Sequence, residues 1–109
     1  MEKIVNVLGT AYTILESSRD TDPALELHDG YCDDTVKKIV IDVLNGGGTG
    51  KKENLEEYKR AVIRHELIHA FASESGLSGC SFAGNEEMVD WVAIQFPKML
   101  KAFQEAGAL

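Results

Sequence analysis

The feature that most constrains this chain is the segment His65-Glu66-Leu67-Ile68-His69, which places two histidines four positions apart within an otherwise apolar run. The whole sequence of 109 residues contains only three histidines. In an α-helix, side chains at positions i and i+4 lie on the same face, so both imidazoles can offer a ring nitrogen to one ion. The segment therefore favours a helix with a pair of metal ligands on one face.

The residues around this motif follow a helical period over about 53–75. At about 100° per residue, one stripe of the helix consists of Tyr58, Val62, His65 and His69. A second apolar stripe, roughly opposite, consists of Ile63, Leu67, Ala70 and Phe71. Gly76 follows at the position where helices commonly end. Such a helix is expected at the centre of a fold, with one stripe on a sheet and the other covered by a later segment.

The first third of the chain has the residue pattern of a small sheet. Residues 3–16 are rich in β-branched side chains around Gly9-Thr10, which predicts a hairpin. A second β-rich segment covers 36–43, and residues 30–34 before it predict a turn or a short partner strand. We therefore expect an α+β fold, in which a small, mainly antiparallel N-terminal sheet packs on the central HExxH helix.

The glycine-rich segment NGGGTGKK at 45–52 is not a phosphate-binding loop. That motif requires glycine where the chain has Asn45, and serine or threonine where it has Lys52. The segment is predicted to be a flexible linker between the last strand and the helix.

Composition excludes several classes of function. The length predicts one domain over 1–109, and the formal net charge of −7 argues against nucleic-acid binding. The sequence has no apolar run long enough to span a bilayer and no features of a secretory signal. We therefore expect a cytoplasmic protein with no membrane partner, in which Cys32 and Cys80 are free thiols. The acidic surface does not indicate an oligomeric state.

The segment NEEMVDWVAIQFPKML predicts a second helix with Asn85 as its N-cap. Glu86 and Glu87 fall in its first turn, where the helix dipole alone also favours acidic residues. Two histidines and one glutamate are a common ligand set for catalytic zinc. Glu86 is preferred as the third ligand because Asp90, one turn later, can accept a hydrogen bond from a ligating imidazole, whereas Trp91, one turn after Glu87, cannot.

The remaining residues of the motif suggest their own roles. Glu66 is turned about 100° from His65, too far to bind the same ion but placed to reach a water beside it, so a general base is expected there. The third histidine, His28, is an alternative ligand or simply a solvated loop residue. In the alternative interpretation, these residues have only structural roles: the paired histidines belong to the core and the glutamates cap a helix.

With these residues the sequence resembles the gluzincin metallopeptidases, whose signature is HExxH followed by a glutamate on a second helix. Asn85, Glu86 and Asp90 match their Asn-Glu-x-x-x-Asp block. Over nearly its whole length the chain is also similar to ImmA/IrrE-like peptidases and to small metallopeptidase-like proteins of Gram-positive prophages. The resemblance implies a minimal zincin-like fold, Zn²⁺ bound by His65, His69 and Glu86, and Asp90 orienting a ligand.

The leading expectation is a zinc-dependent peptidase that hydrolyses peptide bonds by metal-activated water, with Glu66 as the base. Its peptide or protein substrate would bind as an extended strand on a sheet edge between residues 28 and 43. Larger gluzincins add a second lobe that stabilises the oxyanion, and 109 residues leave no room for one. The alternatives are therefore a zinc protein of phage or mobile-element origin that binds a partner without cleaving it, and a purely structural protein.

The rest of the sequence predicts packing. The tyrosines Tyr12, Tyr31 and Tyr58 are expected to pack rather than to act on substrate. Pro97 is expected to kink the second helix near 93–96. The apolar residues of that helix are predicted to be core residues, namely Val89, Trp91, Val92, Ile94, Phe96, Met99, Leu100 and Phe103.

Overall fold

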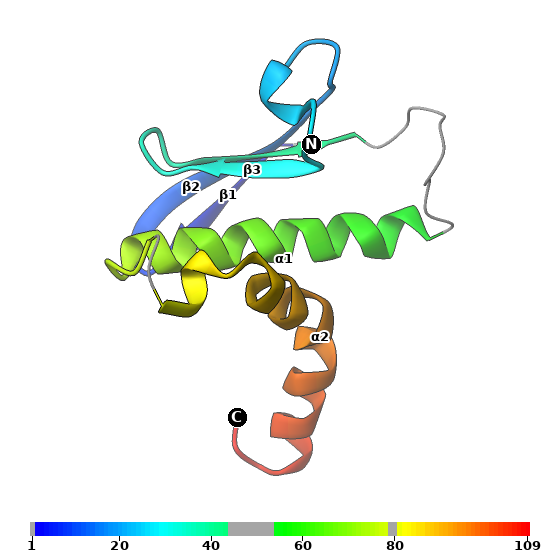
Figure 1. Cartoon of the computed structure of the whole chain (residues 1–109). Coiled ribbons are helices and arrows are strands. Elements are labelled where there is room, and N and C mark those ends of the chain that lie inside the picture. The colour runs from blue at the N-terminus through cyan, green and yellow to red at the C-terminus, as the bar shows by residue number, and fades with distance from the viewer. Residues whose placement is uncertain (1, 44–53, 79–80) are drawn as a thin grey trace.

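A computed structural model describes residues 2–43, 54–78 and 81–109 of the chain. Its strands are β1 (Glu2–Val7), β2 (Thr10–Ser17), β3 (Gly30–Asp33) and β4 (Lys38–Asp42), and its helices are α1 (Leu55–Glu74) and α2 (Glu86–Glu105), with short 3-10 turns η1 (Pro23–Leu25) and η2 (Ser81–Gly84). The sheet lies against one side of α1, and α2 lies on another (Figure 1). This arrangement confirms the predicted α+β class. The predicted linker at 45–52 and Cys80 lie outside the described residues.

Within the described residues the strands form one four-stranded sheet in the order β1-β2-β4-β3. The pairs β1–β2 and β3–β4 are antiparallel, as expected for a mainly antiparallel sheet. The central pair β2–β4 is parallel, so the sheet is mixed. Residues 30–34, for which turn and strand were both open, contribute the edge strand β3.

The hairpin between β1 and β2 turns one residue earlier than expected. Leu8 and Gly9 both have positive φ, at 51° and 96°. Two central residues with positive φ match the twist of the flanking strands, which is why such turns are preferred in hairpins. Thr10 is therefore the first residue of β2 and not part of the turn.

The core lies between the sheet and α1. A buried cluster joins Val7, Tyr12, Ile14, Ile39, Ile41 and Ala70, with Val62, Ile63 and Leu67 packed against it. Phe71, predicted to belong to the core, is 42% exposed. Its position follows from helix geometry, because the residue after Ala70 is turned about 100° away from the sheet. Val62, placed on the histidine stripe by its spacing, lies close enough to the sheet to pack on the core.

The carboxylate of Glu74 joins the end of α1 to the sheet. It accepts hydrogen bonds from the hydroxyls of Thr10 and Tyr12 on β2, each at 2.8 Å, and from Lys37 Nζ, also at 2.8 Å. The Glu74 side chain is 14% exposed. Three donors on one carboxylate favour its charged form, and the Lys37 hydrogen bond is the largest of the effects that lower the pKa of Glu74 to about 2.

This pKa predicts how stability depends on pH. The folded value lies below the ordinary value of 4.5, so the charged carboxylate stabilises the fold above about pH 4.5, and this contribution is lost as the pH falls toward 2. We expect Glu74→Gln to lower the melting temperature by a few degrees at pH 7, with the deficit shrinking between pH 4.5 and pH 2. Thermal unfolding followed by circular dichroism measures it, with the exposed Glu105→Gln as control. Equal deficits at pH 7 and pH 2 would contradict the assignment.

Helix α2 is held on α1 through its first half. Asn85 Oδ1 accepts a hydrogen bond from the Met88 backbone N–H at 3.1 Å, as its predicted role of N-cap requires. Val89 and Ala93 are fully buried. Arg64 Nε on α1 donates to the carbonyl oxygen of Ala93 at 2.5 Å. This contact fixes where α2 crosses α1.

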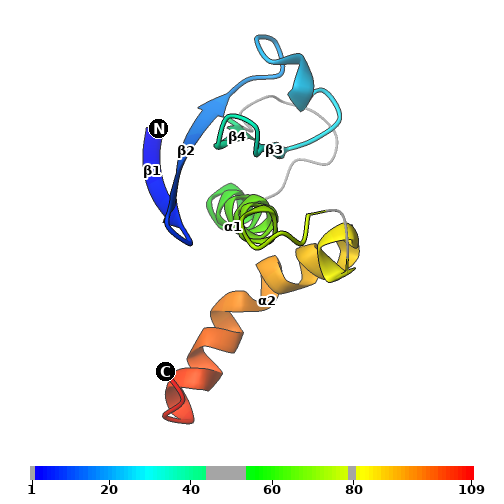
Figure 2. The same ribbon diagram turned by 90° about the vertical axis from the view of Figure 1, so that its left-hand side faces the viewer.

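The helix continues through Pro97, but its axis turns between its two halves, as expected of an internal proline (Figure 2). Pro97 has no N–H to donate to the carbonyl four residues earlier, which is that of Ala93. Arg64 satisfies this carbonyl instead. Pro97 therefore accounts both for the kink in α2 and for the Ala93 carbonyl that is left to accept from Arg64.

The prediction that all the apolar residues of α2 are core residues is wrong. Trp91 is 53% exposed, Ile94 50%, Phe96 41% and Phe103 44%. Phe96 and Phe103 belong to the second half of α2, which leads away from both α1 and the sheet (Figure 2), whereas Trp91 and Ile94 lie on a side of the first half that α1 does not cover. Among the helices formed by the described residues, none is long and apolar enough to cross a membrane.

Candidate metal centre

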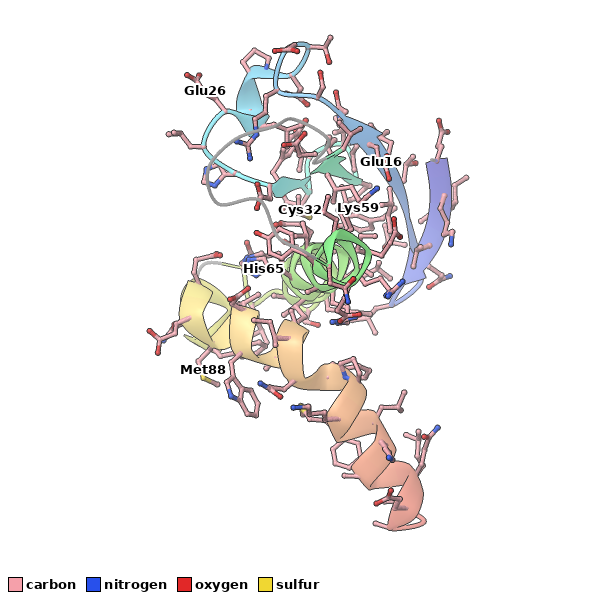
Figure 3. All side chains as sticks on the ribbon, turned by 90° about the vertical axis from the view of Figure 1, so that its right-hand side faces the viewer. Glu16, Glu26, Cys32, Lys59, His65 and Met88 are labelled. Carbon is pink, nitrogen blue, oxygen red and sulfur yellow. The ribbon has the colours of Figure 1, made fainter. Side chains whose placement is uncertain are left out.

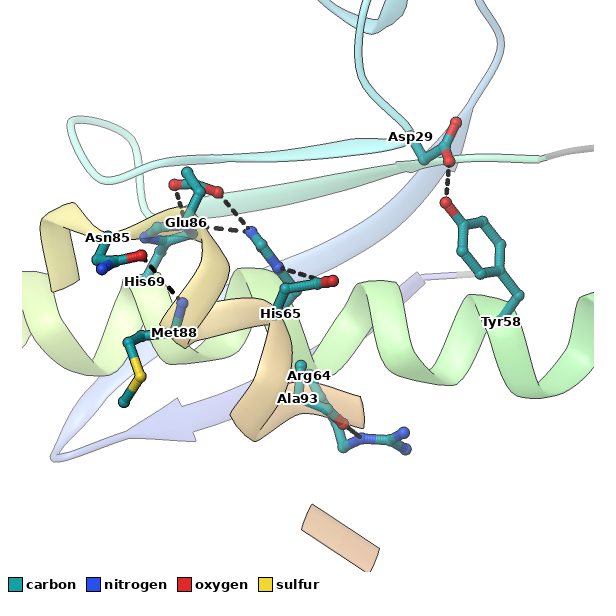
Figure 4. A network of polar contacts seen from close by, with 10 residues as sticks. Asp29, Tyr58, Arg64, His65, His69, Asn85, Glu86, Met88 and Ala93 are labelled. Atoms are coloured by element: carbon teal, nitrogen blue, oxygen red, sulfur yellow. Dashed lines mark hydrogen bonds and ion pairs between the residues drawn. The ribbon is translucent and has the colours of Figure 1, made fainter. Parts of the chain in front are cut away.

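Three side chains from the two helices converge at the crossing of α1 and α2. His65 Nε2 lies 2.9 Å from Glu86 Oε2, and His69 Nε2 lies 2.9 Å from Glu86 Oε1. The two Nε2 atoms are 3.3 Å apart. Figure 4 shows the Glu86 carboxylate facing both imidazoles. Among the described residues, this is the group whose donor atoms, all within 4.8 Å of one another, could hold a metal ion.

The spacing of these donors fits a tetrahedral site. Ligands bound at 2.0–2.1 Å around a tetrahedral zinc ion are roughly 3.3 Å apart, which is the distance between the two imidazole nitrogens. The nitrogen–oxygen distances of 2.9 Å need only a small outward movement of Glu86, which is free to move because its side chain is 69% exposed. Two imidazoles and a carboxylate suit zinc and also other divalent first-row metals.

Local structure places each donor. The i, i+4 spacing on α1 stacks the two histidines, whose ring centroids are 5.0 Å apart. Glu86 is the first residue of α2, directly after its cap Asn85. Burial is the largest effect on the pKa of His69 and lowers it, which favours the neutral imidazole that a metal requires.

Glu66 lies beside this group but faces the sheet. It is 8% exposed, and its pKa is raised to about 7, mainly because burial disfavours the charged carboxylate; the nearby Glu86 adds to the rise, whereas His65 opposes it. Cys32 on β3 is close by, since the Glu66 carboxylate adds to the burial that raises the pKa of the thiol to about 12. The residue predicted to be the general base is thus a buried carboxyl group whose pKa is near neutral.

Asp90 lies one turn beyond Glu86, and its Oδ1 is 3.3 Å from His65 Nδ1, the ring nitrogen that does not face the candidate ion. Of the other ligands considered, Glu87 lies outside the metal-binding group, and so does His28, although it lines the same cavity. Glu86 is therefore the acidic residue that contacts both histidines through their Nε2 atoms.

We expect Asp90→Asn to weaken metal binding about 10-fold to 100-fold, because a carboxylate that accepts from a ligating imidazole fixes the ring and raises its basicity. Titration against a chromophoric chelator measures the affinity. Glu105→Gln, at the far end of the same helix, serves as control. An unchanged metal affinity in the Asp90 variant would mean that the 3.3 Å contact has no part in binding.

A cavity of about 1030 Å³ opens between α1 and β3 at this group. Its lining includes His65, Glu66, His69, Glu86 and Asp90. Figure 3 shows Cys32 on β3 above His65 on α1, and both belong to the lining. The cavity therefore brings together the residues that sequence analysis assigned to metal binding and catalysis.

Asp29 in the lining of this cavity and its partner Arg19 were not predicted from the sequence. Asp29 lines it and accepts a hydrogen bond from the Tyr58 hydroxyl (Figure 4). Arg19 bonds Asp29 at 2.5 Å and Asp42 at 2.8 Å. These contacts join segments distant in sequence, so no local pattern indicates them.

Comparisons with protein-family models, with curated proteins and with solved structures found no match. The resemblance to gluzincins therefore rests on the motif residues themselves. Independently of this resemblance, the structure has an α+β fold in which His65, His69 and Glu86 form a group that could hold a metal ion.

Proposed function

We propose that this protein is a zinc-dependent peptidase. The observation that carries the proposal is the convergence of His65 Nε2, His69 Nε2 and the Glu86 carboxylate, within 2.9–3.3 Å of one another, in a cavity that Glu66 also lines. A structural pair of core histidines would need neither an acidic partner from a second helix nor a buried carboxyl beside it.

In the proposed hydrolysis, zinc and the side chains of the protein have different roles. Zinc, when bound, supplies a Lewis acid that lowers the pKa of water toward neutrality. Glu66, a buried carboxyl group that lines the same cavity, is suited to take a proton from the attacking water and to deliver it to the departing amine. Asp90 would hold the His65 ring in the orientation that presents Nε2.

The substrate would be an extended peptide that pairs with β3. This strand lies at the edge of the sheet and lines the cavity through Gly30, Tyr31 and Cys32. A strand with an unpaired edge offers main-chain donors and acceptors to a peptide lying beside it. It falls within residues 28–43, where the sequence led us to expect the binding edge.

The test joins metal analysis with turnover. Protein purified without chelators should contain about one equivalent of zinc. It should cleave members of a broad peptide library, lose this activity on chelation and regain it when zinc is restored. Failure to bind zinc even at saturating concentration would refute the proposal.

A second candidate is a zinc protein that binds a peptide or partner without cleaving it. The favouring observation concerns the tyrosines, which are the natural candidates to stabilise an oxyanion. Tyr58 donates to Asp29, and Tyr31 donates to Asp22 at 2.6 Å, so neither hydroxyl is directed at the ligand group. Zinc and peptide binding without any hydrolysis would identify this second function.

A further inference from the structure

The two ends of the cavity differ in the size of their side chains. On the side of His69 toward the end of α1, the lining includes the small residues Ala72, Ser73, Ser78 and Ala83, together with Asp34 directly after β3. On the opposite side of His65, toward the start of α1, it includes Tyr58 and Asp29. A peptide lying along β3 therefore meets mostly small side chains in one direction and the aromatic ring of Tyr58 in the other.

Tyr58 connects the two walls of the cavity. It lies two turns before His65 on the same stripe of α1, so its ring rises on the side of the helix that carries the metal ligands. Its hydroxyl donates to Asp29, directly before β3, and thus reaches from the helix to the strand (Figure 4). Arg19 holds the other oxygen of Asp29 at 2.5 Å. Arg19 therefore holds Asp29 in position for its contact with Tyr58.

The distance between the candidate metal ligands and the Tyr58–Asp29 contact limits how many peptide residues fit between them. Seven residues of helix between Tyr58 and His65 span about 10 Å at a rise of about 1.5 Å per residue. An extended peptide advances about 3.3 Å per residue, so about three residues fit between the ion and Tyr58. Between them the cavity is lined by Ala61 and Val62, whose side chains are shorter than those of Tyr58 and His65.

We propose that the Tyr58–Asp29 contact closes one end of the cleft, so that the substrates are chain ends, with about three residues bound between the ion and Tyr58. This inference rests on the proposed peptidase function and narrows its substrate class to terminal tripeptide segments. Because β3 and α1 run in the same direction (Figure 1), a peptide paired antiparallel to β3 would point its carboxyl end at Tyr58.

The experiment measures binding and does not depend on turnover. Two series of peptides with one to six residues carry a zinc-chelating hydroxamate, at the amino end in one series and at the carboxyl end in the other. Their affinities for the zinc-loaded protein are measured by calorimetry. Each residue that pairs with β3 should raise affinity about fivefold, the effect of roughly one net hydrogen bond. The gain should stop after about three residues in the series that points toward Tyr58, and continue in the other.

Two variants identify the cause of the limit. Tyr58→Ala, which removes the ring, should let affinity rise beyond three residues, and Tyr58→Phe, which removes only the hydrogen bond to Asp29, should do so to a smaller extent; melting curves check that both fold. The proposal is overturned if neither series of wild type shows a limit, or if a folded Tyr58→Ala variant leaves it in place. If the shortest hydroxamates bind while no limit appears, the metal site stands and only the closed end is wrong. If no hydroxamate binds, the proposed function itself fails.

Discussion

Glu66→Gln is expected to slow peptide hydrolysis about 10²-fold to 10⁴-fold, the usual contribution of a general base, while zinc stays bound. Glutamine has nearly the shape of glutamate, so it can occupy the same buried place next to β3, where Glu66 is 8% exposed. It cannot take up a proton. Since Glu66 lies outside the metal-binding group, the donors for zinc remain complete.

Two measurements on the same preparation decide this prediction. Zinc content is determined by elemental analysis, and hydrolysis is followed on the best substrate found for the wild type. Glu56→Gln, an exposed change in the first turn of α1, is the control and should keep both properties. Full activity in the Glu66 variant would remove this residue from the chemistry.

The second large effect is expected from Glu86→Gln. A neutral amide is a much poorer zinc ligand than a carboxylate, so affinity should fall by more than the roughly 10-fold to 100-fold typical of groups that only support a ligand. The neighbouring Glu87→Gln is a matched control, because it removes the same charge from the same helical turn and lies outside the metal-binding group.

Competition with a chelator of known affinity measures both variants at one pH. Comparable losses in the two variants would show that general acidity at the start of α2 attracts the ion and that neither glutamate binds it directly. A loss confined to Glu87→Gln would reverse the choice between them. The comparison therefore tests the residue assignment without relying on catalysis.

Much of the site could be predicted because its information is local. The spacing of His65 and His69 needs only helix geometry, and the positions of Glu86 and Asp90 need only a cap at Asn85 and one helical turn. The α+β class follows from the order of strand-like and helical periods. In each case the residues that decide the outcome lie within a few positions of one another.

The rest depends on contacts between distant segments. The parallel pairing of β2 with β4 joins strands that are separated by residues 18–37, so no turn motif reveals it. Glu74 gathers its donors from residues 37 to 64 positions away. The exposure of Phe103 follows from the bend in α2 rather than from its hydrophobicity, and Trp91 lies on a side of the helix that α1 does not cover. An apolar helical pattern shows that a face could be buried, not that a partner lies against it.

Because the candidate donors come from two different helices, a bound ion would also have a structural role. His65 and Glu86 are 21 residues apart in sequence, so a bound ion would staple the segment between them into a closed loop, much as a disulfide does. A ligand at 1,000 times its dissociation constant adds about 4 kcal/mol to folding stability. The concentration of zinc would then determine how stably α2 packs on α1. In zinc-depleted medium, a protease should therefore cut the segment between His65 and Glu86 first.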